Sequence, residues 1–326
     1  MQLYPPLEPD RSGLLDTGDG HQVYWETSGN PQGTPVLLLH GGPGSGSTPG
    51  QRRLWNPEQY RIVQMDQRQC GRSLPSAADP AVPLTANTTA HLLADIEQLR
   101  EALGISRWVL WGGSWGVTLA LAYAQQSPER VRALVLISVT TTRRSDVHWL
   151  YHEAGRFFPR QWQEFAEFAS QSDTGVMGAE ARADLVAAYH HLLNVQEDPH
   201  VRAQAAQAWC DWEDAVLSLE PGWKPSPRYQ EPAFRMQFAR IVTHYFHHGA
   251  WLAEGQLLEQ AWRLAGIPGV LIHGRLDIGS PADVPWQLSR AWPEAELHLV
   301  TEAGHAGNRR STELMLAAAQ RFAAAP

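Results

Sequence analysis

The sequence predicts an α/β protein with a mostly parallel sheet and an inserted helical cap. Short apolar runs followed by turn residues recur through residues 1–141 and again through residues 262–326, with helical patterns between them. Residues 142–261 lack such runs and carry amphipathic helical patterns instead. Strands that alternate with helices favour a parallel sheet, and a strand-free insertion favours a separate helical lobe. We therefore expect a core of residues 1–141 and 262–326 and a cap domain of residues 142–261.

The strands are expected in the order in which their apolar runs appear. Gly18-Asp19-Gly20 interrupts residues 14–27 and predicts a hairpin. The later runs are apolar on both faces, which is typical of buried parallel strands. They cover residues 36–39, 62–65, 108–111 and 131–139, and the strand pattern resumes at residues 270–273 and 296–300.

In the segments between these runs, apolar residues recur at the spacing of a helix. Residues 88–103 place leucine and isoleucine three or four residues apart, and Gly104 ends the pattern. Further helices are expected over residues 117–126, over residues 285–292 and in the alanine-rich segment after Thr312. The cap would lie over the carboxyl ends of the strands, where open α/β sheets bind their ligands.

Composition and charge exclude several classes of partner. A net charge of −8 argues against a nucleic-acid partner. No apolar run approaches the roughly 18 residues that cross a bilayer, and residues 1–13 lack the apolar stretch of a signal peptide. Cys70 and Cys210 form neither a disulfide framework nor a zinc-ligand spacing. The sequence thus predicts a cytoplasmic globular protein without a nucleic-acid or membrane partner, and it leaves the oligomeric state open.

A candidate nucleophile follows the third parallel strand. Residues 112–116 read Gly-Gly-Ser-Trp-Gly, a G-x-S-x-G sequence between a predicted strand and a predicted helix. Such a turn lifts the serine hydroxyl out of the sheet, and the small flanking glycines avoid collisions. A serine needs a base to act as a nucleophile, so Ser114 predicts partners elsewhere in the chain.

The partners are expected after the last two strands, in the chain order serine, aspartate, histidine. Asp277 follows the strand at residues 270–273, and His305 follows the strand at residues 296–300. Asp277 would hold the imidazole of His305 in the tautomer that takes the proton of Ser114. Asp283 and His298 are the nearest rivals, but one lies in the following helical segment and the other lies within a strand.

A glycine-rich loop follows the first parallel strand. Residues 40–44 read His-Gly-Gly-Pro-Gly, which matches the oxyanion loop of hydrolases that use a serine nucleophile. The backbone amides of Gly42 and Trp115 are expected to bind the oxyanion that forms when a serine attacks a carbonyl group. We call the turn at residues 112–116 the elbow, and Ser114, Asp277 and His305 the triad. The elbow, the chain order of the triad and the glycine-rich loop together predict the α/β-hydrolase fold.

These motifs resemble those of the proline iminopeptidases over nearly the whole chain. The resemblance rests on residues 40–44, residues 66–73 (Asp-Gln-Arg-Gln-Cys-Gly-Arg-Ser), residues 111–125, residues 238–241 and residues 244–246. It implies removal of an N-terminal residue from a small peptide or aminoacyl-amide substrate. It also implies that cap carboxylates hold the free amino group.

Part of the substrate-binding pattern of that family is altered. The Trp-x-x-Trp-Glu sequence at residues 209–213 makes Glu213 the implied anchor for the substrate ammonium group. The second glutamate of the family is absent, because Val242 stands in its place. Thr140 and Leu150 stand where the resemblance implies aromatic residues of the proline pocket. These changes predict a wider and looser pocket.

Three functions remain open at this point. The leading hypothesis is a serine aminopeptidase or amidase that releases an N-terminal residue, proline by the resemblance, through an acyl-enzyme. The second keeps this chemistry but removes a small aminoacyl group from a bulky non-peptide intermediate of a natural-product pathway. The third is a ligand-binding protein that has kept the fold without turnover.

Histidines also gather in the cap sequence. His244 and His248 are four residues apart, so they share one face of a helix, and His247 lies beside them. No HExxH carboxylate accompanies them, and a Ser–His–Asp triad needs no metal, so we expect neither a metal site nor a cofactor. The pair His190-His191 is interpreted as part of the cap surface.

Overall fold

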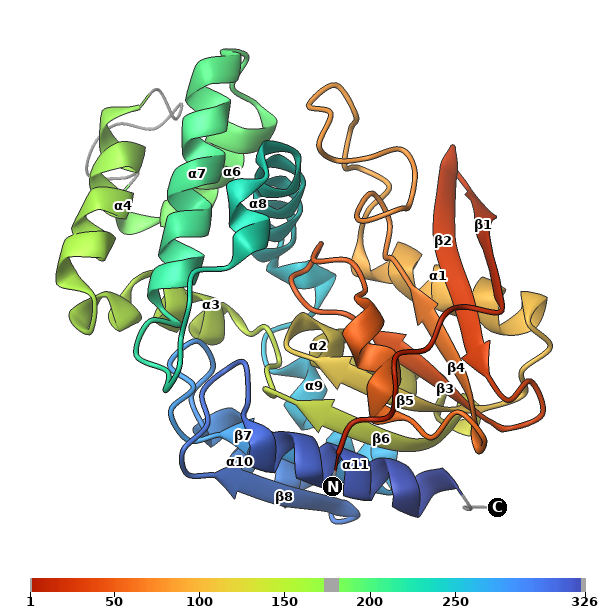
Figure 1. Cartoon of the computed structure of the whole chain (residues 1–326). Coiled ribbons are helices and arrows are strands. Elements are labelled where there is room, and N and C mark those ends of the chain that lie inside the picture. The colour runs from red at the N-terminus through yellow and green to blue at the C-terminus, as the bar shows by residue number, and fades with distance from the viewer. Residues whose placement is uncertain (1, 173–181, 324–326) are drawn as a thin grey trace.

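The computed structural model describes residues 2–172 and 182–323. Residues 1 and 324–326 of the predicted core and residues 173–181 of the predicted cap lie outside the described residues. The strands form one eight-stranded sheet in the order β1-β2-β4-β3-β5-β6-β7-β8 (Figure 1). They are β1 Arg11–Gly18, β2 His21–Gly29, β3 Thr34–Leu39, β4 Tyr60–Met65, β5 Trp108–Gly113, β6 Val131–Ile137, β7 Gly269–Gly274 and β8 Ala295–Val300.

The sheet is antiparallel at one edge and parallel elsewhere. β1 and β2 form the predicted hairpin, and β2 also pairs antiparallel with β4. From β4 to β8 every neighbouring pair is parallel. The prediction of a mostly parallel sheet is confirmed. Because parallel strands end at the same edge, the segments that follow β3, β5, β7 and β8 can meet there.

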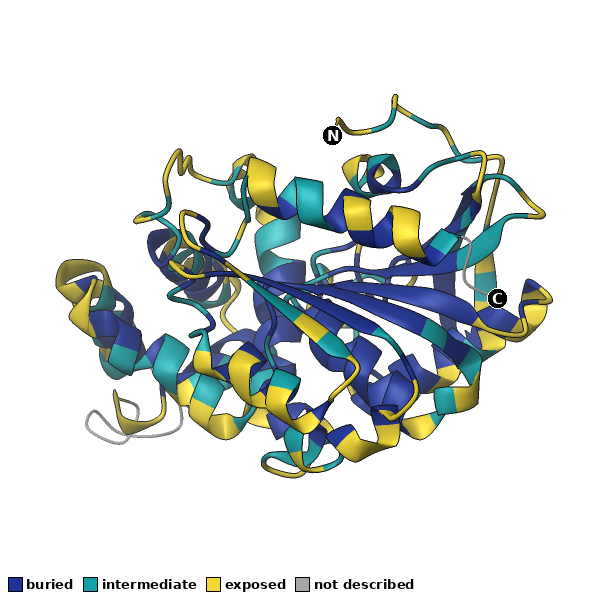
Figure 2. Cartoon of the chain, turned by 90° about the horizontal axis from the view of Figure 1, so that it is seen from below, coloured by how far each residue is buried: buried dark blue, intermediate teal, exposed yellow. Residues whose placement is uncertain are grey.

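Both faces of the central parallel strands are covered, which explains their apolar runs. Side chains alternate along β3, so Leu37 and Leu39 enter one apolar cluster and Val36 and Leu38 enter another. The first cluster includes side chains of α1 Thr89–Ala102, α2 Trp115–Gln126 and α10 Asp283–Ala291, and the second includes side chains of α11 Arg309–Ala323. Figure 2 shows the buried strands between these layers.

The chain leaves the sheet after β6 and returns at β7. The end of the segment between them packs in the first apolar cluster of the core through Leu257, Ala261 and Leu264, and the part before it forms a helical lobe that we call the cap. Figure 1 shows it to one side of the sheet. Its described residues contain helices and no strand. Its principal helices are α3 Arg144–Tyr151, α4 Pro159–Gln171, α6 Leu185–Asn194, α7 Pro199–Ala215 and α8 Pro232–His247.

The cap has an apolar cluster of its own, in which aromatic rings pack closely. Phe165 stacks on Tyr189 with ring centroids 4.3 Å apart, and Trp209 and Trp212 pack beside Phe165. Val242 on α8 belongs to this cluster and is 1% exposed. This cluster packs the helices of the cap against one another.

Helix α8 is fastened to the core by two polar side chains. The buried guanidinium group of Arg240 donates hydrogen bonds to the carbonyl groups of Ala77, Asp79 and Val82 at 2.7–2.9 Å. Gln237 donates to the carbonyl group of Gly44, the last residue of the predicted oxyanion loop, at 3.0 Å. These bonds set the position of the cap above the carboxyl ends of the strands.

Among the described residues, no helix has both the length and the apolar character that crossing a bilayer requires.

Candidate active site

Ser114 occupies a sharp turn between β5 and α2. Its backbone has φ 55° and ψ −124°, a conformation that non-glycine residues rarely adopt. The turn fits only because its neighbours lack side chains. A Cβ atom on Gly116 would lie 2.1 Å from the carbonyl oxygen of Leu39, and one on Gly112 would lie 2.4 Å from that of Gly116. This turn holds the hydroxyl group above the edge of the sheet, and the surrounding packing maintains its strained backbone.

The structure brings His305 and Asp277 to this serine. Nε2 of His305 lies 3.0 Å from Oγ of Ser114, and Nδ1 lies 2.8 Å from Oδ2 of Asp277. Asp277 is buried and accepts a further hydrogen bond from the amide of Ser280 at 2.9 Å. With the proton on Nδ1, the ring donates to Asp277 and accepts the hydroxyl proton of Ser114 through Nε2.

The rival residues lie elsewhere. Asp283 is exposed at the start of α10, where it accepts a hydrogen bond from Gln287. His298 lies on β8 with its Nε2 3.0 Å from the carboxylate of Glu296. Neither is among the hydrogen-bond partners that the described residues give to Ser114 or His305.

The electrostatics around His305 favour its charged form. Burial by itself lowers the pKa of His305, but the adjacent Asp277 carboxylate raises it to about 9. The Glu220 and Glu213 carboxylates act in the same direction. The imidazolium that forms when the ring takes a proton is therefore stabilised.

Glu220 contacts the loop of His305, and sequence reasoning missed it. It lies after α7, and its carboxylate accepts hydrogen bonds from the amides of His305 and Ala306. Burial raises the pKa of Glu220, although these amides and His305 oppose that rise. Its sequence neighbours, Pro221 and Gly222, are ordinary turn residues and carry no signal for such a role.

The oxyanion loop and the elbow are joined by Gln67. Its side chain accepts a hydrogen bond from Nε1 of Trp115 at 2.9 Å and donates one to the carbonyl group of His40, also at 2.9 Å. Its backbone amide donates to Nε2 of His40 at 3.0 Å. Gly42 and Trp115 both line the pocket beside Ser114. Gln67 lies in residues 66–73, which carried much of the family resemblance. Its hydrogen bonds fix the position of the oxyanion loop relative to the elbow.

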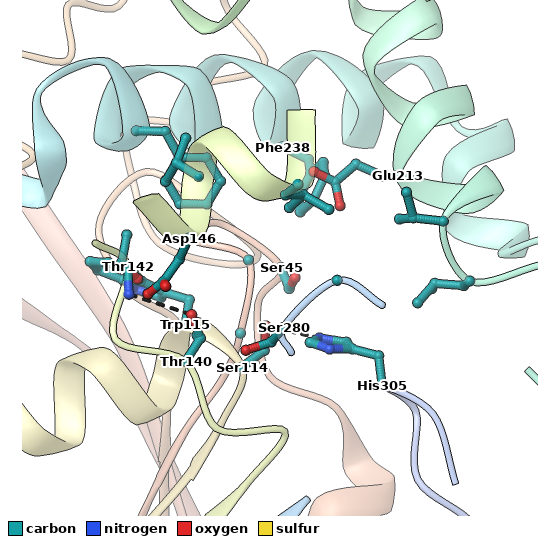
Figure 3. A pocket seen from close by; sticks show the side chains of 18 of the residues that line it. Ser45, Ser114, Trp115, Thr140, Thr142, Asp146, Glu213, Phe238, Ser280 and His305 are labelled. Carbon is teal, nitrogen blue, oxygen red and sulfur yellow. Dashed lines mark hydrogen bonds between the residues drawn. The ribbon is translucent and has the colours of Figure 1, made fainter. Parts of the chain in front are cut away.

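The pocket above Ser114 is a cavity of about 240 Å³. Core and cap both line it, and Figure 3 shows Ser114 and His305 on the core side with Glu213 and Phe238 on the cap side. The predicted residues Thr140, Leu150 and Glu213 are in the lining. The described lining residues that sequence reasoning did not single out include Ser45, Asp146, Val147, Val216, Leu217, Tyr229, Phe238 and Phe246.

Val242 is placed differently from the other predicted pocket residues. It packs inside the apolar cluster of the cap and is absent from the described lining of the pocket. The same helix does present Phe238 and Phe246 to the pocket. Both belong to the segments that carried the family resemblance, so the sequence held a signal for them.

Glu213 is the carboxylate that faces the nucleophile across the pocket (Figure 3). It accepts a hydrogen bond from the hydroxyl group of Tyr151 at 2.6 Å. Burial raises the pKa of Glu213, while Tyr151 and His305 lower it. Asp146 also lines the pocket, but its carboxylate is paired with Arg143 at 2.7 Å. Glu213 therefore keeps more of its bonding capacity for a ligand.

The parallel sheet, the elbow and the Ser–His–Asp contacts together define a serine hydrolase of the α/β-hydrolase fold, as predicted. A family model described as alpha/beta hydrolase fold matches residues 34–308. A probable proline iminopeptidase of Streptomyces coelicolor is 47% identical over 99% of this chain and 98% of its own. A proline iminopeptidase of Xylella fastidiosa is 45% identical over 93% of this chain and 93% of its own. One of Arabidopsis thaliana is 41% identical over 97% of this chain and 80% of its own. The chain belongs to the proline iminopeptidase family.

Solved structures show the same fold at lower sequence identity. A crystal structure of a proline iminopeptidase from Mycobacterium smegmatis has a TM-score of 0.60 and 20% identity, and covers 96% of this chain and 97% of that one. An α/β hydrolase from a deep-sea metagenome library has a TM-score of 0.61 and 17% identity, over 95% and 96%. This likeness extends over core and cap.

Proposed function

We propose that the protein is a serine aminopeptidase that releases N-terminal proline from small peptides through an acyl-enzyme. The observation that carries this proposal is a carboxylate, Glu213, facing the hydroxyl group of Ser114 across a small pocket. The relatives named as proline iminopeptidases match nearly the whole chain. They favour this function over aminoacyl removal from a non-peptide intermediate and over ligand binding without turnover.

Acylation would begin at Ser114. His305 takes the hydroxyl proton through Nε2, and Oγ attacks the carbonyl carbon of the N-terminal residue. The amides of Gly42 and Trp115 bind the resulting oxyanion. His305 then gives the proton to the leaving nitrogen, and the shortened peptide departs. The same histidine activates the water molecule that releases the free amino acid.

Glu213 would select substrates with a free amino group. The positively charged imino nitrogen of an N-terminal proline would form a charge-assisted hydrogen bond with this carboxylate. Its lining neighbours Tyr229, Phe238 and Phe246 offer apolar and aromatic surface to the pyrrolidine ring. Thr140 and Leu150 leave more room beside that ring than aromatic side chains would.

Cytoplasmic localisation belongs to the same proposal. Cys70 and Cys210 are both buried and free, as thiols are in a reducing compartment.

The test is a screen of prolyl, alanyl and glycyl arylamides, each with a free and with a blocked amino group. We expect prolyl arylamide to have the highest kcat/KM and its blocked form to be hydrolysed about 100-fold more slowly. Turnover should be absent in Ser114→Ala, as should labelling by a fluorophosphonate probe. Equal rates for free and blocked substrates would contradict the role of Glu213, and labelling of Ser114→Ala would contradict the role of the serine.

A further inference from the structure

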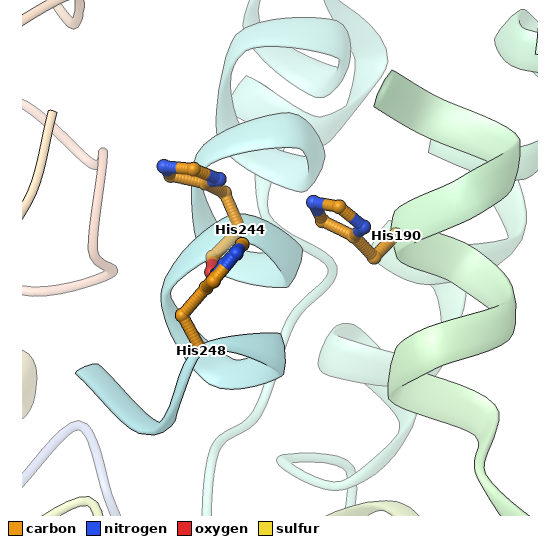
Figure 4. Close-up of side chains that lie close together, drawn as sticks. All are labelled: His190, His244 and His248. Atoms are coloured by element: carbon orange, nitrogen blue, oxygen red, sulfur yellow. The ribbon is translucent and has the colours of Figure 1, made fainter. Parts of the chain in front are cut away.

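Three imidazole rings meet in the cap, outside the candidate active site. His190 lies on α6, and His244 and His248 lie one helical turn apart at the end of α8. One ring nitrogen of each lies within 4.8 Å of those of the other two. In Figure 4 the ring of His190 points from α6 toward the rings of α8. None of the three is among the described residues that line the catalytic pocket.

The rings of His190 and His244 favour the neutral form that binds metal ions. Burial, together with the neighbouring imidazoles, lowers the pKa of His190 to about 3 and that of His244 to about 4. Both rings are therefore neutral at physiological pH and keep a lone pair on one nitrogen. Metal binding requires that state, because a protonated imidazole has no free lone pair.

The surroundings also orient the rings. Nδ1 of His248 lies 2.8 Å from the carbonyl oxygen of His244, so Nδ1–H donates and Nε2 keeps the lone pair. Metal-binding histidines commonly make such a bond with their other nitrogen. His247 stacks on His190 at 4.3 Å, and Trp251 stacks on His248 at 4.9 Å. His248 is exposed, which gives an ion a route from the solvent.

We propose that His190, His244 and His248 form a binding site for a divalent transition-metal ion such as Zn²⁺. Imidazole nitrogens that share one zinc ion at 2.0–2.1 Å lie about 3.3 Å apart, so small side-chain rotations would close the site. A donor set of three imidazoles suits zinc, copper or nickel and does not suit magnesium or calcium, which prefer oxygen ligands. Water would complete a tetrahedral shell.

A bound ion would connect two cap helices. α6 and α8 come from separate parts of the cap sequence and pack side by side. A metal bridge between them would stabilise the folded cap by binding only the native arrangement. This proposal concerns a site apart from the catalytic pocket and does not depend on the proposed peptidase activity.

The experiment titrates the full-length, metal-free protein with Zn²⁺ and measures heat, and with Co²⁺ and measures visible absorption. We expect one zinc ion per chain and a visible Co²⁺ spectrum of a tetrahedral site. His190→Gln and His248→Gln should each weaken zinc binding roughly tenfold or more. His191→Gln is the matched control, since His191 is adjacent on α6 but outside the cluster, and it should bind zinc like the parent protein.

Circular dichroism of each variant checks that the cap is folded. Zinc should also raise the Tm of the parent protein and of His191→Gln, but not that of the double variant His190→Gln/His248→Gln. The proposal fails if the parent protein takes up no zinc at a concentration of about 100 μM. It also fails if the folded double variant keeps the same affinity and stoichiometry as the parent protein.

Discussion

The carboxylate of Glu220 accepts a hydrogen bond from the backbone amide of His305 at 2.6 Å, and one from the amide of Ala306 at 3.2 Å. This contact connects the segment that follows α7 with the loop that carries the histidine. Gly304 permits it, because a Cβ atom there would lie 2.3 Å from the carboxylate carbon. The cap therefore helps to position His305 as well as enclosing the pocket.

Replacing this carboxylate should affect catalysis through His305. We expect Glu220→Gln to lower kcat about tenfold with little change in KM, because the loop loses a charge-assisted hydrogen bond. The pKa of His305 should also fall, since the Glu220 charge contributes to raising it. A pH profile of kcat/KM measures this shift. Glu259→Gln, an exposed change on α9 Gln256–Glu259, is the control and should leave the profile unchanged. If the pH profile of kcat/KM is the same in Glu220→Gln as in the parent protein, Glu220 contributes only to the packing of the loop.

Glu213 is expected to discriminate between substrates with and without an amino group. Glu213→Gln should lower kcat/KM for prolyl arylamide about 100-fold, because the ammonium group loses its charged partner. Hydrolysis of a small ester such as 4-nitrophenyl acetate should change little, since it has no amine to bind. Steady-state kinetics on the two substrates provide the measurement. A similar loss on both would indicate that Glu213 supports the pocket rather than the ammonium group.

The pKa of His305 predicts how activity depends on pH. Burial opposes the charge of His305, but Asp277 raises its pKa to about 9. The neutral ring is the base, so kcat/KM for an ester should increase as pH rises through about 9 and then level off. The ester avoids titration of a substrate amine. An activity that is already constant above pH 7 would contradict this assignment.

The same shift has a consequence for stability. The folded-state pKa of His305 lies above its ordinary value of 6.5, so protonation stabilises the folded state. This contribution is complete below pH 6.5 and is lost as pH rises through about 9. The loss should be smaller in His305→Gln, which cannot titrate. Urea unfolding of both proteins at pH 6 and pH 9.5 measures the difference, and identical pH dependence in the two would exclude this contribution.

Thr140 should influence how large an N-terminal residue the pocket accepts. We expect Thr140→Phe to narrow the cavity of about 240 Å³. The ratio of kcat/KM for prolyl over phenylalanyl arylamide should then rise about tenfold. Thr312→Phe is a suitable control, because this residue lies on α11 away from the pocket lining. A ratio that does not change would indicate that another wall of the pocket limits size.

Several features could be predicted because they depend on local sequence. The strands follow from apolar runs, and Ser114, Asp277 and His305 each follow a strand of the parallel part of the sheet. Parallel strands end at one edge, so chain order alone indicated that these three side chains meet. Gly112 and Gly116 could likewise be placed in the elbow, because a sharp strand-to-helix turn excludes side chains there.

The amino-acid sequence by itself determined the α/β-hydrolase fold and the residues that meet at the edge of the sheet. Only the tertiary structure decided which cap residues reach that edge. Glu220 contacts the loop that carries His305, and Val242 packs inside the cap. The ring of His190 on α6 lies beside that of His244 on α8. The physical reason is that a helical pattern shows which residues share a face, whereas the packing of several helices decides what that face meets.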